Sequence, residues 1–242
     1  MSTPSINPYY GESRSDRASR VRALFNRIAP RYDLVNDVQS FGLHRFWKRR
    51  LIRMAQPNSP EKALDVCCGT GDITLAIAKR GVETTGVDFS PGMLEQARQR
   101  NTASAQATFI EADALQLPFE DAHFDLVTIA YGLRNLEDFE AGLDELARVL
   151  KPGGRMLVLD FGKPDNPLWR RLYFGYLGWM VPLFGSLFCG DSAAYSYILE
   201  SLKHYPAQRG VAKRMSGMGF EGVKVDAILG GVMSINFGRK PA

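Results

Sequence analysis

The sequence is poor in cysteine and histidine. Its 242 residues include three histidines and three cysteines, Cys67, Cys68 and Cys189, of which two are adjacent. These few residues match no zinc-binding spacing, so we expect no metal site. An odd number of cysteines also excludes the paired framework of a small secreted protein and favours a reducing compartment.

Targeting signals and long hydrophobic runs are scarce as well. The first residues lack the basic-then-apolar pattern of a secretion signal, so we expect a cytoplasmic protein. One uncharged stretch, Leu172–Cys189, has 18 residues, fewer than the roughly 20 that a membrane span needs. Pro182 and three glycines interrupt it, and Arg170 and Arg171 precede it. We therefore favour a slot for a substrate tail or a helix at a membrane interface, then an ordinary core helix, and a true span least.

The composition is otherwise that of a soluble globular protein, but its charge is unevenly distributed. Apolar residues make up 45% and charged residues 23% of the chain, which excludes a disordered or fibrous protein. The net charge is +4, yet residues 1–60 hold 11 Lys and Arg against four Asp and Glu. Such a basic leader favours contact with a nucleic acid, an anionic membrane surface or an acidic ligand about as strongly as it favours a solvated helix face.

The hydrophobic pattern of the first 60 residues is helical. Val21, Leu24 and Ile28 recur at helical spacing until Pro30 interrupts the pattern, and a second, basic amphipathic helix is predicted over Phe41–Met54. We expect residues 1–60 to form a helical N-terminal extension, or lid, and residues 61–242 to form the main domain.

Short apolar runs alternate with helical segments from residue 62 onward. A helix over Asp138–Leu150 should close on a Lys151-Pro-Gly-Gly154 turn, and Ser90 should cap a helix that begins at Pro91. The alternation predicts an α/β fold with helices on both faces of a parallel sheet. The expected strands are Ala63–Val66, Thr84–Val87, Ala107–Ile110, Asp125–Ala130 and Arg155–Phe161.

The alternation ends after Phe161. Residues 167–218 form a predicted helical insertion, with a helix over Tyr195–Met218. Two further strands, Val223–Leu229 and Val232–Phe237, are joined at Gly230-Gly231, which indicates a hairpin.

A glycine-rich loop follows the first strand, in Leu64-Asp-Val-Cys-Cys-Gly-Thr-Gly-Asp72. Ligands of open α/β sheets bind beyond the carboxyl ends of strands, and Gly69 and Gly71 let backbone N–H groups approach a ligand closely. A dinucleotide-binding loop has a third glycine where this chain has Thr74. Asp65 also suits a cationic amino group better than a pyrophosphate.

Acidic residues also follow the next two strands. Asp88 suits the two hydroxyls of a ribose, and Asp113 suits an adenine amino group. Taken singly, each acid is more typical of a loop or a helix cap. Their joint position after three successive strands indicates an adenosine with a cationic tail, which is S-adenosylmethionine.

These stretches resemble the class I S-adenosylmethionine-dependent methyltransferases. Phe25–Leu34, Tyr131-Gly-Leu-Arg-Asn135 and Asp160-Phe-Gly-Lys-Pro164 are similar, more narrowly, to the menaquinone/ubiquinone biosynthesis C-methyltransferases. The resemblance extends from about Val21 to Lys240. It implies a Rossmann-like, seven-stranded, mostly parallel sheet with an antiparallel last strand. It also implies C-methylation of a polyprenylated quinol, with demethylmenaquinol favoured over a benzoquinol.

The resemblance also implies site residues. The family's cofactor contacts fall on Thr70, Asp88, Asp113 and Ala114, which together with Asp65, Gly69 and Gly71 form the predicted cofactor site. Arg134 is the candidate for stabilising a phenolate, although a surface salt bridge is its alternative role. An arginine is too basic to accept the proton itself. Asn135 is expected either to orient the quinol or to cap the next helix, and Tyr32 to belong to the lid or to pack as an ordinary aromatic residue.

Three other functions compete with this one. A dinucleotide-dependent oxidoreductase is disfavoured by Thr74 and by the acid after the third strand. An RNA methyltransferase is disfavoured because the aromatic residues of the leader occupy helical core positions, so we expect no nucleic acid. A non-catalytic protein would retain the cofactor site without binding a quinol. Two further features are compatible with the sequence. One is peripheral contact with the inner, anionic face of a membrane, and the other is a homodimer.

Overall fold

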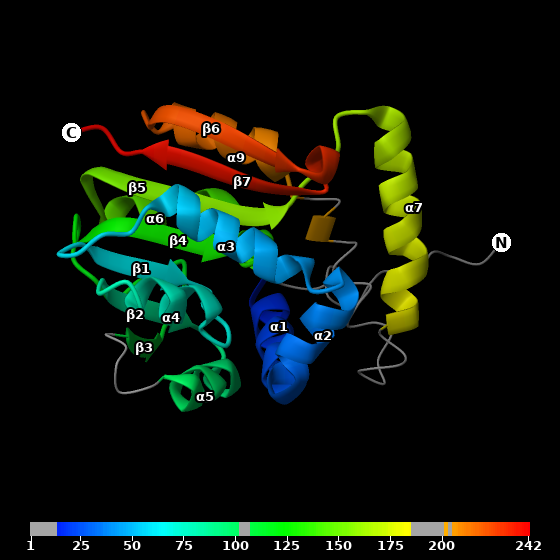
Figure 1. Cartoon of the computed structure of the whole chain (residues 1–242), viewed down its shortest axis with the longest axis horizontal. Coiled ribbons are helices and arrows are strands. Elements are labelled where there is room, and N and C mark those ends of the chain that lie inside the picture. Colours follow the sequence, from blue (N-terminus) through cyan, green and yellow to red (C-terminus); the bar gives the residue numbers. More distant parts are fainter. Residues whose placement is uncertain (1–13, 102–106, 185–200, 203–204) are drawn as a thin grey trace.

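The computed structural model describes residues 14–101, 107–184, 201–202 and 205–242 (Figure 1). Within these residues the chain forms a seven-stranded sheet in the order β3-β2-β1-β4-β5-β7-β6. The strands are β1 (Lys62–Val66), β2 (Glu83–Asp88), β3 (Ala107–Glu111), β4 (Phe124–Ala130), β5 (Leu150–Phe161), β6 (Glu221–Ile228) and β7 (Met233–Arg239).

Only one strand runs against the others. The pairs from β3 through β5 are parallel, whereas β7 is antiparallel to both β5 and β6. The hairpin expected near Gly230 is present, with a short 3-10 helix, η4 (Leu229–Gly231), between its strands. The predicted α/β class, the mostly parallel sheet and the antiparallel last strand are therefore confirmed.

The expected turn at residues 151–154 is wrong. The fifth strand begins at Leu150, which pairs with Phe124, and the next pair is Leu126 with Arg155. The four intervening residues therefore form a bulge inside β5 instead of a turn before it. Gly153 has a φ of +73°, a backbone conformation that a residue with a side chain rarely adopts.

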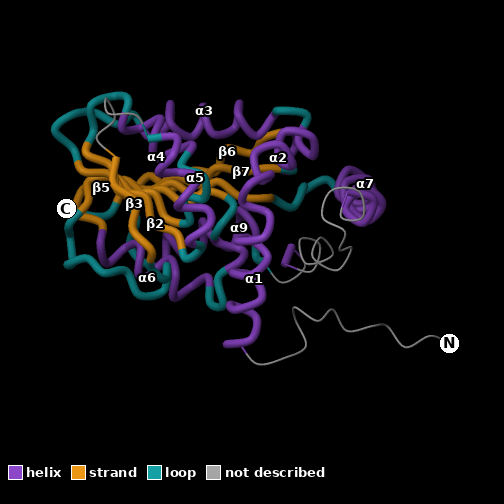
Figure 2. The backbone as a smooth tube through the Cα atoms, turned by 90° about the horizontal axis from the view of Figure 1, so that it is seen from below, coloured by secondary structure: helices purple, strands orange, loops and turns teal. Residues whose placement is uncertain are grey.

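Helices cover both faces of the sheet (Figure 2). On one face, α3 (Leu43–Ala55) packs on Leu157 and Leu159 of β5, and α4 (Asp72–Ala78) packs on β1 and β2. On the other, α6 (Phe139–Val149) and α9 (Ala207–Gly217) pack on Met156 and Val158. Successive residues of a strand point to opposite faces, so one run of four apolar residues supplies two cores.

The N-terminal helices divide into two groups. The helices α1 (Arg14–Ile28) and α2 (Tyr32–Ser40) lie beyond the carboxyl ends of the central strands (Figure 1), with Pro30 in the 3-10 turn between them as expected. The next helix begins at Leu43 and not at Phe41, because Phe41 adopts a left-handed conformation that ends α2. Trp47 and Leu51 of α3 belong to the same core as the sheet.

Two more helices lie elsewhere, one against β2 and β3 and the other at the edge of the molecule. Helix α5 (Pro91–Arg100) begins at the expected Ser90 cap, whose hydroxyl accepts a hydrogen bond from the Met93 N–H. Helix α7 (Pro167–Phe184) stands at the edge of the molecule beside α2 (Figures 1 and 2). No helix in the described ranges combines the length and the apolar character needed to cross a bilayer.

The single helix expected over Tyr195–Met218 is wrong in its described part. Pro206 lacks the N–H that a continuous helix would need, and it stands as the N-cap of α9, which begins at Ala207. The rest of that expectation, and Cys189, lie outside the described residues.

Candidate functional site

The glycine-rich loop joins β1 to α4 at the carboxyl edge of the sheet. Gly71 has a φ of +83°, and a Cβ built there would lie 3.0–3.1 Å from Phe109 and Ala97. A side chain at this position would therefore strain the backbone and collide with the neighbouring strand and helix. Cys67 and Cys68 pack against two different hydrophobic clusters, and burial raises the pKa of both thiols.

Asp65 lies behind this loop and not on a cavity wall. One carboxylate oxygen accepts hydrogen bonds from the Thr74 hydroxyl at 2.7 Å and the Thr74 N–H at 3.1 Å, and the other accepts from the Thr128 hydroxyl at 2.8 Å. Burial raises the pKa of Asp65 to about 6, which these hydrogen bonds oppose. Asp65 therefore joins the loop and α4 to β4.

A cavity of about 680 Å³ opens in front of the loop. We call it the cofactor cavity because most of the residues predicted to bind a cofactor lie on its wall; it is bounded by the carboxyl ends of the first four strands and by one side of α1. Its volume lies within the range of small-molecule sites. The predicted site residues on its wall are Gly69, Asp88, Asp113, Ala114 and Asn135.

Two carboxylates at this edge have different surroundings. Asp88 is buried and accepts hydrogen bonds from the N–H groups of Gly69 at 2.8 Å and Ser90 at 2.9 Å. Burial raises its pKa to about 6, against the effect of these hydrogen bonds. Asp113 is exposed and accepts from the Leu115 N–H at 2.8 Å. Each oxygen of an ionised carboxylate has two lone pairs, so both side chains keep acceptor capacity.

Helix α1 covers the cofactor cavity, and two of its residues, Arg22 and Asn26, make contacts there that were not predicted from the sequence. Arg22 and Phe25 line the cavity, and Arg22 forms an ion pair with Glu111 at the end of β3. Asn26 accepts hydrogen bonds from the Ser90 hydroxyl at 2.6 Å and the Gly92 N–H at 3.1 Å. The only sequence signal for these contacts was the family-like stretch that begins at Phe25.

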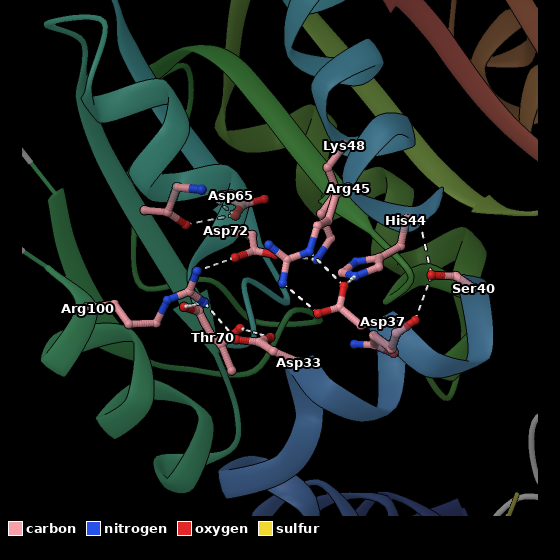
Figure 3. A network of polar contacts seen from close by, with 12 residues as sticks. Asp33, Asp37, Ser40, His44, Arg45, Lys48, Asp65, Thr70, Asp72 and Arg100 are labelled. Atoms are coloured by element: carbon pink, nitrogen blue, oxygen red, sulfur yellow. Dashed lines mark hydrogen bonds and ion pairs between the residues drawn. The ribbon is translucent and has the colours of Figure 1, made fainter. Parts of the chain in front are cut away.

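A polar network, which we call the clasp, fastens the N-terminal helices to the loop (Figure 3). It consists of Asp33, Lys48, Thr70, Asp72 and Arg100. Arg100 donates to the Thr70 carbonyl at 2.8 Å and to Asp33 at 3.1 Å, and it also pairs with Asp72. Lys48 lies 2.8 Å from Asp72. Burial opposes ionisation of Asp72, but Lys48 and Arg100 outweigh it and lower the pKa to about 2.

A second cavity, the apolar chamber, lies beside the first. It has a volume of about 260 Å³ and is enclosed by α1, α2, α3, α7 and the start of β7. Its wall is mainly apolar and aromatic, and Arg134 lies on it. Four residues line both cavities, namely Phe25, Tyr32, Tyr131 and Asn135.

Arg134 forms a buried ion pair and not the surface salt bridge that was its alternative role. Its Nη1 lies 2.8 Å from Asp160 Oδ1 and 2.6 Å from the Tyr131 carbonyl oxygen, and both charged side chains are buried. The guanidinium also lies 4.7 Å from the ring centroid of Phe161. Burial raises the pKa of Asp160, and the charge of Arg134 opposes this shift.

Asn135 lies next to Arg134 and contacts the same backbone. Its Nδ2 donates to the Tyr131 carbonyl oxygen at 3.1 Å. The helix-capping alternative is wrong, because the N-cap of α6 is Asp138, which accepts from the N–H groups of Glu140 and Ala141. The motif from Tyr131 to Asn135 therefore forms the wall where the two cavities meet.

Comparison with known proteins gives a consistent result. The sequence profile of the ubiE/COQ5 methyltransferase family matches residues 13–240. The ubiquinone/menaquinone biosynthesis C-methyltransferase UbiE of Azotobacter vinelandii is 40% identical over 239 residues, which cover 96% of this chain and 94% of that protein. The demethylmenaquinone methyltransferase of Thermus thermophilus is 42% identical over 221 residues, covering 90% and 100%.

Solved structures share the fold at low sequence identity. A methyltransferase from Thermotoga maritima, dependent on S-adenosylmethionine, has a TM-score of 0.64 at 19% identity and covers 90% of this chain and 99% of its own. Phosphoethanolamine N-methyltransferase 2 from Haemonchus contortus, in complex with S-adenosylmethionine, has a TM-score of 0.60 at 15% identity, covering 81% and 52%. At these identities the likeness establishes the fold alone.

Proposed function

The chain belongs to the ubiE/COQ5 methyltransferase family, and we propose that it methylates a ring carbon of a polyprenylated quinol, converting demethylmenaquinol to menaquinol. As a member of this family it is a methyltransferase that uses S-adenosylmethionine. The corresponding benzoquinol of ubiquinone biosynthesis is the alternative acceptor, since the names of the two relatives above cover both quinones. Family membership leaves the oxidoreductase and RNA alternatives without support.

The observation that carries this proposal is the shared wall of the two cavities. Phe25, Tyr32, Tyr131 and Asn135 border both the cofactor cavity and the apolar chamber. Methyl transfer to carbon requires the acceptor carbon and the sulfonium methyl to be held in line and in contact. A charged cofactor and an apolar acceptor in adjoining cavities meet that requirement.

The cofactor cavity fits the parts of S-adenosylmethionine. Asp88 would accept from the ribose hydroxyls, Asp113 from the adenine amino group, and Ala114 would lie against the base. The backbone of Gly69 would border the amino-acid end. Thr70 and Gly71 do not line the cavity and would act by shaping the loop, which Asp65 positions from behind. S-adenosylmethionine supplies the electrophilic methyl group.

The apolar chamber fits the quinol ring. Arg134 would stabilise the negative charge that develops on the ring oxygen, because Asp160 and Phe161 hold its guanidinium in one orientation. A preorganised donor of this kind needs no rearrangement at the moment of reaction. Asn135 would orient the ring from the shared wall.

The N-terminal extension would act as a lid. We assign this role to residues 1–60, because Arg22, Asn26 and the clasp join its helices to the cofactor edge. Residues 167–218 would form the substrate side, where Tyr173 and Leu177 of α7 pack against Leu24 of α1.

The polyprenyl tail implies contact with a membrane, and one surface suits it. The outer side of α7 exposes Leu168, Leu172 and Trp179, two of them by more than 65%. Arg171 on the same helix is exposed as well. Tyr176, which lies among these residues, also lines the apolar chamber. We propose that this side of α7 lies on the inner, anionic face of a membrane, so that the tail can enter the chamber from the lipid.

The test uses purified protein and cells lacking it. The purified protein should transfer a labelled methyl group from S-adenosylmethionine to reduced demethylmenaquinol faster than to the matching benzoquinol. Cells without the protein should accumulate demethylmenaquinone, which mass spectrometry detects. Accumulation of a demethylated benzoquinone alone would favour the alternative acceptor, and an unchanged quinone pool would contradict the proposal.

A further inference from the structure

Carbon methylation of a quinol needs a group that removes the hydroxyl proton. The ring carbon becomes a strong nucleophile only when the neighbouring oxygen bears negative charge. Arg134 stabilises that charge but cannot accept the proton, because an arginine stays protonated in proteins. Six titratable residues line the apolar chamber among those described: Tyr32, His44, Tyr131, Arg134, Tyr173 and Tyr176.

Five of these six are poor proton acceptors near neutral pH. Burial raises the pKa of the four tyrosines, so each keeps its proton. Arg134 keeps its charge. His44 is the one remaining titratable residue of the described wall.

His44 forms a dyad with Asp37 (Figure 3). Its side chain is 5% exposed, and Nε2 lies 2.8 Å from Asp37 Oδ1. Asp37 also accepts two hydrogen bonds from Arg45, at 2.7 and 2.6 Å. Hydrogen bonds from Arg45 and then from His44 hold the pKa of Asp37 well below its usual range. An ionised carboxylate only accepts, so the hydrogen of His44 is assigned to Nε2 and the lone pair to Nδ1.

The other ring nitrogen is in the state that a proton acceptor requires. Nδ1 of His44 is buried, and no hydrogen-bond partner for it exists among the described residues. Burial lowers the pKa of His44, as does Lys48, whereas Asp37 of α2 and Asp72 of α4 oppose this. The imidazole is therefore neutral at neutral pH. His44 lines the apolar chamber, and a buried polar atom that has no partner calls for an explanation such as a catalytic role.

We propose that His44 accepts the proton of the quinol hydroxyl, with Asp37 fixing its tautomer, an inference that rests on the proposed methylation of a quinol. The hydroxyl proton passes to Nδ1, and the ring carbon beside that oxygen attacks the sulfonium methyl. The sulfur–methyl bond breaks and its electron pair stays on sulfur, giving S-adenosylhomocysteine. The ring carbon then loses its hydrogen to water while His44 returns its proton to the oxygen. One proton is released for each methyl group transferred.

The pair of His44 and Asp37 has the arrangement of a histidine and a carboxylate in acid–base catalysis. A carboxylate that holds one imidazole nitrogen leaves the other free to take a proton and then stabilises the imidazolium that forms. Positioned proton transfer of this kind contributes about 10²–10⁴-fold to rates.

The test variant is His44→Gln. Its amide nitrogen can donate to Asp37 in place of Nε2, but it has no basic nitrogen in place of Nδ1. We expect kcat for reduced demethylmenaquinol to fall about 100-fold or more. Binding of S-adenosylmethionine by calorimetry and the melting temperature should stay near those of the unchanged protein. His123→Gln, the same change in a residue that lines neither cavity, should leave kcat unchanged.

Two further measurements separate proton transfer from a structural role. In the unchanged protein kcat should fall at acid pH as His44 becomes protonated, and His44→Gln should lack this acid limb. A halogen-substituted demethylmenaquinol, whose hydroxyl is more acidic, should reduce the rate deficit of His44→Gln. If that variant does not fold, Asp37→Asn serves instead, because it permits the other tautomer of His44 and should also lower kcat.

The outcomes distinguish this inference from the proposed function. If the unchanged protein methylates demethylmenaquinol and His44→Gln does so at a similar rate, His44 is not the proton acceptor. A rate deficit of His44→Gln that is independent of pH and of quinol acidity would overturn the inference too. If the unchanged protein methylates no quinol while binding S-adenosylmethionine, the proposed function itself fails.

Discussion

Asp33 of α2 accepts a hydrogen bond from the Thr70 hydroxyl of the glycine loop, with 2.8 Å between the two oxygens. The two residues are 37 positions apart in the sequence. Their contact joins the N-terminal helices to the loop that borders the cofactor cavity. Because α2 and α3 also wall the apolar chamber, movement of these helices would affect both cavities at once.

Loss of that contact should loosen the lid. We expect Thr70→Val to weaken binding of S-adenosylmethionine by about 1 kcal/mol, the usual net value of one hydrogen bond. The loss should lie mainly in faster dissociation, measured by stopped-flow fluorescence. Thr108→Val, the same substitution at an exposed position of β3, is the control. Equal dissociation rates for the two variants would mean that the clasp does not restrain the cofactor.

Asp88 should contribute directly to cofactor binding. Asp88→Ala removes the carboxylate proposed to hold the ribose, so we expect S-adenosylmethionine affinity to fall by about 1.5–3 kcal/mol, the range for hydrogen bonds to a charged group. Calorimetry on the folded variant measures this. Glu95→Ala, on the exposed side of α5, should bind normally. An unchanged affinity of Asp88→Ala would remove this residue from the cofactor site.

The buried carboxyls should make the ligand-free protein more stable at mildly acid pH. Asp65 and Asp88 have pKa values near 6 in the folded chain, against about 3.9 when unfolded. Between these pH values the folded state binds more protons than the unfolded state. The stabilising contribution of the two carboxyls is therefore complete below pH 4 and is lost as pH rises through 6. Each group contributes up to about 3 kcal/mol to this dependence over the full pH range.

Urea unfolding at pH 5 and pH 7.5 measures this effect. Folding lowers the pKa of His44 from 6.5, so this residue makes the folded state less stable as pH falls below that value. It is one group against two, and the carboxyls should therefore dominate. Asp88→Asn should flatten the dependence, because its amide does not titrate. Greater stability at pH 7.5 than at pH 5 would contradict the assignment.

Arg134 should matter for the chemical step more than for binding. We expect Arg134→Lys to lower kcat by roughly 100-fold, the scale of losing one preorganised donor, with cofactor affinity unchanged. Arg134→Ala leaves Asp160 buried without its partner and should destabilise the fold by about 3–5 kcal/mol. Lysine is therefore the informative replacement. Near-normal turnover of Arg134→Lys would show that the guanidinium geometry is not needed.

Membrane contact should depend on the outer side of α7. The protein should co-sediment with anionic vesicles and be released as salt rises, because exposed charges are screened. Trp179→Glu should reduce the bound fraction, since it places a negative charge on the proposed lipid-facing side. Val225→Glu, at an exposed position of β6, should not. Equal binding to neutral and anionic vesicles would reject the electrostatic part of the contact.

The sequence by itself determined the parts of the fold that depend on near neighbours. Alternating apolar runs predicted the first four strands to within one residue, and the Ser90-Pro91 pair predicted the start of α5. A strand or a helix cap is specified by a few adjacent residues, so its signal survives in the linear pattern. The acids after successive strands could also be placed at one edge of the sheet, because parallel strands end at the same edge.

Only the tertiary structure decided what each of those side chains contacts. Asp65 follows a strand as Asp88 does, yet Thr74 and Thr128 enclose it behind the loop, whereas Asp88 reaches the cavity. The ion pair of Arg134 with Asp160 brings together residues 26 positions apart. In the sequence, His44 is one residue of an amphipathic helix. Its pairing with Asp37 is visible only in the structure, where α2 brings the two side chains together. Burial and pairing depend on strand order and on how helices close over the sheet, and no short stretch of sequence encodes either.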